Sequence, residues 1–212
     1  MKFYPIYLDL RDRSCLVVGG GQVAERKTLT LLEAGANVRI ISPSLTQKLQ
    51  ELSQSGKIIH LPKTVDDKDL TGALLVIAAT DSLEVNAGIG RLCKKRNILV
   101  NVVAPPDESS FIVPSVVERG ELLIAVSTSG MSPALSKKIR QELEERYGPE
   151  YEVFLRKMSM LRARLMDEVK DDGVRREILQ ALVDSDVISL LKEGKIHDAD
   201  HRLAEIVKLK PK

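Results

Sequence analysis

Three consecutive glycines, Gly19–Gly21, are the residues whose type and spacing most directly indicate chemistry in this chain. The apolar run Leu16–Val18 precedes them, and a helical pattern of apolar residues that begins with Val23 follows at once. A strand that turns through glycine into a helix leaves backbone N–H groups open at the positive end of the helix dipole. These residues therefore predict a site for an anion, typically a phosphate.

The spacing Gly19-x-Gly21-x-x-Ala24 matches a dinucleotide-binding fingerprint with alanine in its third position. In that fingerprint Gly19 permits the tight turn, Gly21 lets a pyrophosphate approach the backbone, and Ala24 lets the helix lie close to the strand. The alternative is a tight strand-to-helix connection that binds no ligand. We expect cofactor contacts at Gly19, Gly20, Gly21, Gln22, Val23 and Ala24.

The segment after the second expected strand, Asn37–Ile41, lacks the acidic residue that binds the ribose hydroxyls of the adenosine in many dinucleotide sites. Ser42 and Ser44 can hydrogen-bond the ribose instead, whereas Arg39 favours a 2′-phosphate. The spacing by itself therefore leaves the choice between NAD and NADP open.

Composition limits the classes of function. The chain has 212 residues, of which 43% are hydrophobic and 29% charged, as in ordinary globular proteins. Its net charge of +2 and its lack of tryptophan argue against nucleic-acid binding. The first residues hold no long apolar core, so we expect neither a signal peptide nor a membrane span. Cys15 and Cys93 are far apart, and we interpret them as buried reduced thiols of a cytoplasmic protein.

Strand-type runs alternate with helical patterns in the first half of the chain, which predicts an α/β fold with a Rossmann-like, doubly wound parallel sheet. The expected strands are Leu16–Val18, Asn37–Ile41, Lys57–Leu61, Ala73–Ala79 and Ile98–Val103. Ligands of such sheets bind at the carboxyl ends of the strands. Thr80, Asp81 and Asn101 lie at or near those ends, on the same rim as the glycine turn.

The pattern then changes to an antiparallel hairpin made of Phe111–Val117 and Leu122–Ser127, followed by helices only. The expected helices are Ala134–Tyr147, Tyr151–Lys170, Val174–Val183 and Ile196–Lys208, the first with Ser132 as N-cap and Pro133 in its first position. We expect a nucleotide-binding domain at 1–113, a dimerisation region at 114–148 and a small all-helical domain at 149–212. The hairpin is apolar on both faces and belongs to neither flanking unit, so we predict a homodimer formed through it. The alternative is a hairpin folded back on its own sheet.

Taken together, these segments resemble the precorrin-2 dehydrogenase family, which also forms the N-terminal module of siroheme synthases. The motifs that carry the resemblance are Leu10–Arg13, Val17–Lys27, Ala78–Asp81, Asn101–Val103, Phe111–Ser115 and Ala125–Pro133. The resemblance covers nearly the whole chain, although beyond Pro149 it rests on helical character alone.

The resemblance implies NAD-dependent oxidation of precorrin-2 to sirohydrochlorin in siroheme biosynthesis, and in some members the insertion of Fe²⁺ as well. It places the nucleotide contacts at Gly19–Ala24, at Pro43 and Ser44, and at Thr80 and Asp81. Because precorrin-2 is rich in carboxylates, its site needs hydrogen-bond donors and positive charge. We expect substrate contacts at Asn101, Thr128, Ser129, Gly130 and Lys138. For Lys137, Lys138 and Arg140 the alternative is a solvated helix face paired with glutamates.

One position departs from the family, in which an aspartate follows Asn-Val-Val and serves dehydrogenation and, where it occurs, chelation. This chain has Ala104 there, and a methyl group neither accepts a proton nor binds a metal. Asp107 and Glu108 lie on the same loop, and we take Asp107 as the substitute catalytic base. The alanine threatens iron insertion more than oxidation, which chiefly requires a well-placed nicotinamide.

A metal site is not expected. His197 and His201 share a helix face, but they lie near the end of the chain and no further ligand is evident. His60 is interpreted as structural. Two hypotheses compete with a precorrin-2 dehydrogenase: a bifunctional dehydrogenase and ferrochelatase, and a non-catalytic module that binds NAD or a tetrapyrrole.

Overall fold

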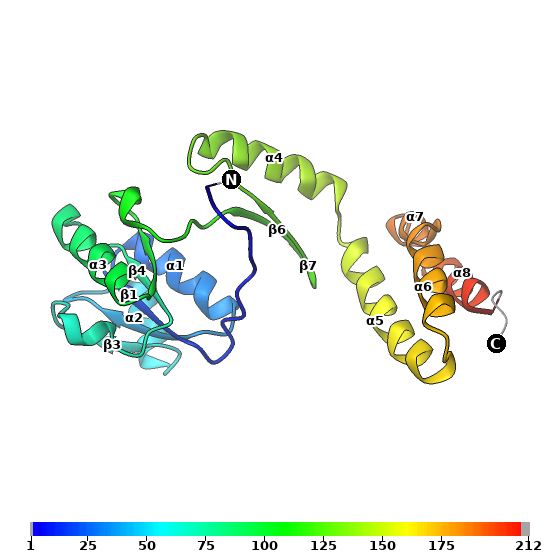
Figure 1. Cartoon of the computed structure of the whole chain (residues 1–212), viewed down its shortest axis with the longest axis horizontal. Helices are drawn as coiled ribbons and strands as arrows, with labels where there is room; N and C mark the ends of the chain where they lie inside the picture. The colour runs from blue at the N-terminus through cyan, green and yellow to red at the C-terminus, as the bar shows by residue number, and fades with distance from the viewer. Residues whose placement is uncertain (1, 209–212) are drawn as a thin grey trace. The chain divides into compact units, whose positions relative to one another are not determined.

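A computed structural model describes residues 2–208 of the chain, and the ends of the predicted domains, Met1 and residues 209–212, lie outside the described residues. The chain divides into two compact units, Met1–Val113 and Pro114–Lys212. The first unit, drawn in blue to green in Figure 1, contains a five-stranded parallel sheet in the order β3-β2-β1-β4-β5. The strands are β1 (Ser14–Val18), β2 (Asn37–Ile41), β3 (Ile59–Leu61), β4 (Leu75–Ala78) and β5 (Leu99–Val102). This confirms the predicted doubly wound sheet.

Both faces of the sheet are covered, which explains why its strands are continuous apolar runs. Alternate residues of β1 belong to different cores: Cys15 and Val17 to one, Leu16 and Val18 to the other. The first core packs against α1 (Gln22–Glu33) and α2 (Gln47–Gln54), and the second against α3 (Leu83–Lys95). Two short 3-10 helices complete the unit: η1 (Asp67–Leu70) and η2 (Pro106–Glu108). The sequence interpretation had not included α2, η1 or η2.

The edge strand β5 is capped by side chains rather than by a further strand. The Val100 N–H donates to the Ser110 hydroxyl and the Val102 N–H to the Ser109 hydroxyl, both at 2.8 Å. Serines 109 and 110 thus satisfy donors that an exposed edge leaves unpaired. They also keep the residues just before the second unit out of the sheet, which explains why Phe111 does not begin a strand as expected.

The second unit holds the hairpin and all remaining helices. Its elements are β6 (Ser115–Arg119), β7 (Leu122–Val126), α4 (Pro133–Arg146), α5 (Glu150–Glu168), α6 (Asp172–Val183), α7 (Val187–Lys192) and α8 (Ile196–Lys208). Ser132 caps α4 and Pro133 occupies its first turn, as predicted. Phe154, Leu165, Leu182 and Leu203 belong to the core shared by α5, α6, α7 and α8. The helix α7 was missed because one and a half turns carry too little periodicity to recognise.

The hairpin pairs β6 with β7 in a separate two-stranded antiparallel sheet, so it does not extend the parallel sheet. Val117 on β6 is fully buried, and both strands contact α4. The expectation that the hairpin belongs to neither flanking unit is wrong, because it shares one compact unit with the helices. The division of that unit into a dimerisation region, 114–148, and a helical domain, 149–212, stays a prediction.

Candidate functional site

The turn between β1 and α1 needs glycine at two positions for reasons of packing. Gly19 has φ +121°, and a Cβ there would lie 2.2 Å from the carbonyl oxygen of Ala79. A Cβ at Gly20 would lie 1.9 Å from the carbonyl oxygen of Ser44. The two residues therefore let the loops after β2 and β4 close onto the turn.

Gly21 differs from its neighbours because a Cβ there would meet nothing within 4 Å. It is exposed and immediately precedes the first residue of α1, where backbone donors and the helix dipole favour an anion. The space above Gly21 is therefore free for a pyrophosphate, and the turn fits a dinucleotide.

A pocket of about 690 Å³ opens at the carboxyl ends of the strands, beside this turn. That volume lies within the range of small-molecule sites, roughly 300–1,000 Å³. Of the expected cofactor residues, Gly19, Gly20, Gly21, Ser42, Pro43, Ser44, Thr80 and Asp81 line it. Gln22, Val23 and Ala24 do not; Ala24 is fully buried in the core, where its small side chain lets α1 pack closely on the sheet. The structure brings the predicted residues from three separate loops together.

The pocket also has a wall that sequence reasoning missed. Leu45, Thr46, Lys63, Thr64, Val65, Ser82 and Val85 line it as well. Residues 63–65 follow β3, a strand that the sequence did predict, so the rule that ligands bind at carboxyl ends would have found them. This wall carries a cation, Lys63, close to the serines that follow β2.

Arg39 does not take part in the pocket, so its suggested role toward a 2′-phosphate is wrong. It lies in the middle of β2, paired with Leu16 and Ile59, rather than at the end of the strand. Its Nη2 lies 3.4 Å from the carbonyl oxygen of Asp69 and 3.5 Å from that of Thr71. The Arg39 guanidinium therefore holds the segment at Asp69 and Thr71 against the sheet.

Asn86 organises the end of β4, and sequence reasoning missed it. Its side chain is buried and makes four hydrogen bonds, because Oδ1 accepts from the N–H and the hydroxyl of Thr80 at 3.0 and 2.7 Å. Its Nδ2 donates to the carbonyl oxygens of Thr80 and Ala104 at 3.0 and 3.2 Å. One amide thus joins the nucleotide pocket to the loop after β5. The sequence offered one signal for a structural role of Asn86: it is a polar residue three positions before Ile89, on the helix face that packs against the sheet.

Glu108, on the loop after β5, forms ion pairs that attach this loop to α3. The Glu108 carboxylate lies 3.1 Å from Lys94 Nζ and 3.6 Å from an Arg91 nitrogen, and Lys94 also donates to the Asp107 carbonyl oxygen at 2.9 Å. Within residues 2–208, the Asp107 carboxylate makes no hydrogen bond or ion pair, and the residue is exposed. Neither acid lines the nucleotide pocket. Of the two acids, Asp107 alone has a carboxylate available as a proton acceptor.

Asn101, expected to contact the substrate, lies half-buried on β5 and donates from Nδ2 to the carbonyl oxygen of Phe111 at 3.2 Å. It thereby secures the chain where the sheet-containing unit ends. Its role toward a substrate stays a prediction.

The remaining expected substrate residues lie in the second unit, around the start of α4. The Thr128 hydroxyl accepts from the Ser132 N–H at 3.0 Å and contacts the Ser136 hydroxyl at 3.2 Å, so it holds the turn together. Ser129 and Gly130 have positive φ values of 55° and 85° and are exposed. Lys138 is also exposed, with Nζ 3.9 Å from Glu142, as the solvated-face alternative anticipates. These residues stay candidates for substrate binding.

The cysteines and histidines serve the fold. Cys15 and Cys93 are free and buried, and burial raises the pKa of each thiol to about 11. His60 Nε2 lies 2.9 Å from the carbonyl oxygen of Ser42 and so supports the loop after β2. Exposed His201 lies 3.4 Å from Glu205. Among the described residues, no group of three or more histidines, cysteines or acids is placed to hold a metal ion.

Comparison with protein families gives two matches along the chain. Residues 6–115 match a family model described as "Putative NAD(P)-binding", and residues 119–146 match one described as "Sirohaem biosynthesis protein central". The first match confirms the predicted dinucleotide cofactor class, whereas the predicted domain bounds stay a prediction. No helix within residues 2–208 is both long and apolar enough to span a membrane.

Two curated relatives are siroheme synthases. The protein from Thioalkalivibrio sulfidiphilus is 37% identical over 195 residues, which are 92% of this chain and 40% of the relative. The protein from Methylobacillus flagellatus is 48% identical over 144 residues, or 68% of this chain and 31% of the relative. The chain thus spans about two fifths, or less, of the length of these relatives.

A solved structure described as "SirC, precorrin-2 dehydrogenase" is similar along its full length. It is 27% identical in sequence, with a TM-score of 0.81, and the match covers 97% of this chain and 100% of that one. The similarity extends through the helical tail, for which the sequence offered only helical character.

Proposed function

The chain belongs to the precorrin-2 dehydrogenase family, in which an NAD(P)-binding domain precedes the central module of sirohaem biosynthesis, and we propose that it oxidises precorrin-2 to sirohydrochlorin with NAD⁺. The observation that carries the proposal is the pocket itself. Its floor combines the glycine turn with the ends of β1, β2 and β4 and fits a dinucleotide. The family matches supply the substrate class.

Bound NAD⁺ would supply the hydride acceptor for this oxidation. The chain contributes the geometry: Gly21 and the start of α1 offer donors for the pyrophosphate, and Ser42 and Ser44 offer groups for the ribose. Asn86 holds Thr80 and the Ala104 carbonyl in one arrangement. Such positioning lowers a hydride-transfer barrier without any group that reacts covalently.

The oxidation removes a hydride and a proton from the macrocycle, so the reaction also needs a proton acceptor. Ala104 cannot serve, and Glu108 is engaged by Lys94 and Arg91. We assign the proton to Asp107, with solvent as the alternative acceptor. The expected substrate residues Asn101, Thr128, Ser129, Gly130 and Lys138 belong to the same proposal.

The test is to incubate the purified chain with precorrin-2 and NAD⁺ without oxygen and to follow NADH and the sirohydrochlorin spectrum. We expect NADH and sirohydrochlorin to form in equal amounts. If NAD⁺ binds but no NADH forms at saturating substrate, the chain is a binding module and the dehydrogenase proposal fails. In a second reaction with sirohydrochlorin and Fe²⁺, we expect no rate above the uncatalysed one because the family aspartate is alanine here.

We further propose that the protein is a cytoplasmic homodimer that pairs through the β6–β7 hairpin. Val116 and Ala125 form a cross-strand pair on the exposed face of the hairpin, and Leu123 on the same face is 42% exposed. Glu118, the partner of Leu123, is the charged residue of this face, and the three exposed apolar side chains beside it favour an isologous interface. Analytical ultracentrifugation tests it: a dimer that Val116→Glu dissociates supports the assignment, and a monomeric native chain contradicts it.

A further inference from the structure

Lys63 is the one cation among the described residues that line the nucleotide pocket. It follows β3, and the same wall contains Ser42 and Ser44, which follow β2. In doubly wound nucleotide-binding folds, the ribose of the adenosine lies at the end of the second strand. Lys63 is therefore placed where a 2′-phosphate on that ribose would seek a positive charge.

Two carboxylates already hold this ammonium group. Lys63 Nζ lies 2.8 Å from Asp69 Oδ1 and 3.2 Å from Asp66 Oδ2. The Asp69 side chain is only 11% exposed, and its hydrogen bond to Lys63 is the main cause of a raised pKa at the lysine. Lys63 thus stays charged, but the net charge of Lys63, Asp66 and Asp69 together is negative.

The two aspartates are fixed by the fold. They form a capping box around η1, in which the Asp66 N–H donates to Asp69 Oδ2 at 2.8 Å and Asp66 Oδ1 accepts from the Lys68 N–H at 2.7 Å. The segment cannot easily swing away, because Leu70 is buried at its end and Arg96 donates to the Asp67 carbonyl oxygen at 2.6 Å.

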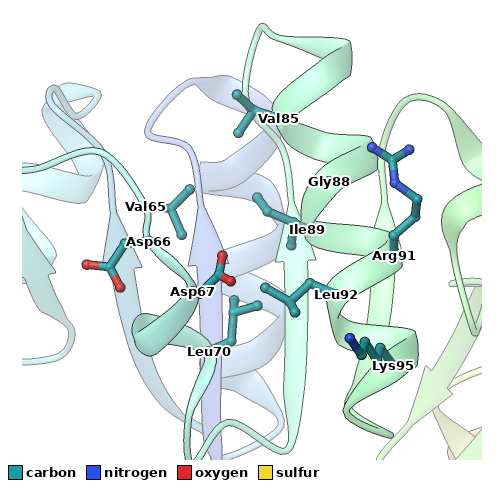
Figure 2. A pocket seen from close by; sticks show the side chains of 10 residues that line it. All are labelled: Val65, Asp66, Asp67, Leu70, Val85, Gly88, Ile89, Arg91, Leu92 and Lys95. Carbon is teal, nitrogen blue, oxygen red and sulfur yellow. The ribbon is translucent and has the colours of Figure 1, made fainter.

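A second cavity, of about 460 Å³, separates η1 from α3 and shares Val65 and Val85 with the nucleotide pocket. Figure 2 shows the Asp66 carboxylate turned away from α3, while Leu70, Ile89 and Leu92 gather between the two segments. Asp66 and Asp67 both line this second cavity, and neither lines the nucleotide pocket. Asp66 forms an ion pair with Lys63, whereas Asp67 lies 4.0 Å from Arg96, so Asp67 provides an internal control.

We propose that Asp66 and Asp69 set the preference for NAD⁺ over NADP⁺ by holding Lys63, so that its ammonium group is already paired and does not serve as the counter-charge of a 2′-phosphate. This rests on the proposed function, in which the pocket binds NAD⁺. A phosphate monoester carries between one and two negative charges at neutral pH, whereas a ribose hydroxyl carries none. The selection acts by withholding a positive charge from the 2′-phosphate, in place of the acidic residue that is missing after β2.

The test measures dissociation constants of NAD⁺ and NADP⁺ by isothermal titration calorimetry on the full chain. The double variant Asp66→Asn/Asp69→Asn keeps side-chain oxygens for the cap but removes both charges. We expect it to bind NADP⁺ about tenfold more tightly and NAD⁺ within about twofold of the native value. Lys63→Gln should weaken NADP⁺ binding relative to the native chain, and by a larger factor than it weakens NAD⁺ binding.

Asp67→Asn is the matched control, since it removes the same charge one residue away without touching Lys63. It should leave the ratio of the two constants unchanged. A ratio unchanged in the double variant, or shifted equally by Asp67→Asn, overturns the inference while NAD⁺ binding stands. A native chain that binds NADP⁺ as tightly as NAD⁺ overturns it as well. Failure of the native chain to bind either dinucleotide instead overturns the proposed function.

Discussion

The glycine turn after β1 and the loop after β5 lie at the carboxyl ends of strands in one sheet, yet they are built in opposite ways. At the turn, Gly19 and Gly20 bring neighbouring loops into contact and leave Gly21 open toward the pocket. At the loop after β5, polar groups turn inward: Glu108 binds Lys94, and Asn86 holds the Ala104 carbonyl. The first region is a backbone cradle, in which main-chain groups face the pocket; the second is a side-chain scaffold, in which side chains hold the loop in place.

The difference shows which functions a substitution can remove. A backbone cradle depends on the absence of side chains, so adding a single methyl group disturbs it. In a side-chain scaffold, function depends on the group that the scaffold leaves available, which we propose to be Asp107. Under the proposed function, NAD⁺ binding therefore depends on several backbone positions, whereas proton removal depends on one side chain.

The largest effect is expected for Gly20→Ala, because its Cβ would lie 1.9 Å from the Ser44 carbonyl oxygen and 2.7 Å from Ser42 Oγ. The loop after β2 must move, and we expect the free energy of unfolding to fall by about 3 kcal/mol. Chemical denaturation of the ligand-free protein measures it. Gly88→Ala on α3 is the control, since its Cβ meets nothing within 4 Å and the variant should be as stable as the native chain or more so. Equal stability of the two variants would refute the tight closure of the turn.

Asn86→Ala should cost about 2 kcal/mol of stability, because it removes the side-chain partner of the part-buried Thr80 N–H and of the Thr80 and Ala104 carbonyl oxygens. It should also raise the dissociation constant of NAD⁺, since Thr80 lines the pocket. Asn86→Asp keeps the acceptor for the Thr80 N–H and hydroxyl but loses the donor to the Thr80 and Ala104 carbonyl oxygens, so it should bind NAD⁺ better than Asn86→Ala does. If the two variants bind NAD⁺ equally, the acceptor for Thr80 does not support the pocket.

The same contrast explains what the sequence could predict. Gly19, Gly21 and Ala24 were identifiable because the constraint lies in residue size at fixed spacing, and the strand ends at Ser42 and Thr80 follow from the alternation of strands and helices. The structural uses of Glu108 and Thr128 were not, because side-chain direction depends on partners distant in sequence or on a turn that no local pattern specifies. Lys63 follows a strand that the sequence did predict, so it was identifiable by the rule that ligands bind at the carboxyl ends of the strands.

Gly21→Ala separates binding from folding. The added methyl group meets no protein atom within 4 Å, so the free energy of unfolding without ligand should stay within about 1 kcal/mol of the native value. The methyl group would occupy the approach of the pyrophosphate, and we expect NAD⁺ to bind about tenfold more weakly, as calorimetry can measure. Native affinity in this variant would contradict the placement of the pyrophosphate above Gly21.

The smallest effect concerns the loop after β5 and compares its two acids. Asp107→Asn should lower kcat by up to about tenfold, with KM unchanged, because solvent remains as a weaker proton acceptor. Glu108→Gln should leave kcat near native and lower stability by about 0.5–1 kcal/mol, since it loses its ion pairs with Lys94 and Arg91. Ala104→Asp, which restores the family residue, should raise kcat and make Asp107→Asn harmless in the double variant. A native kcat in Asp107→Asn would assign the proton to solvent, and the loop would then be a scaffold alone.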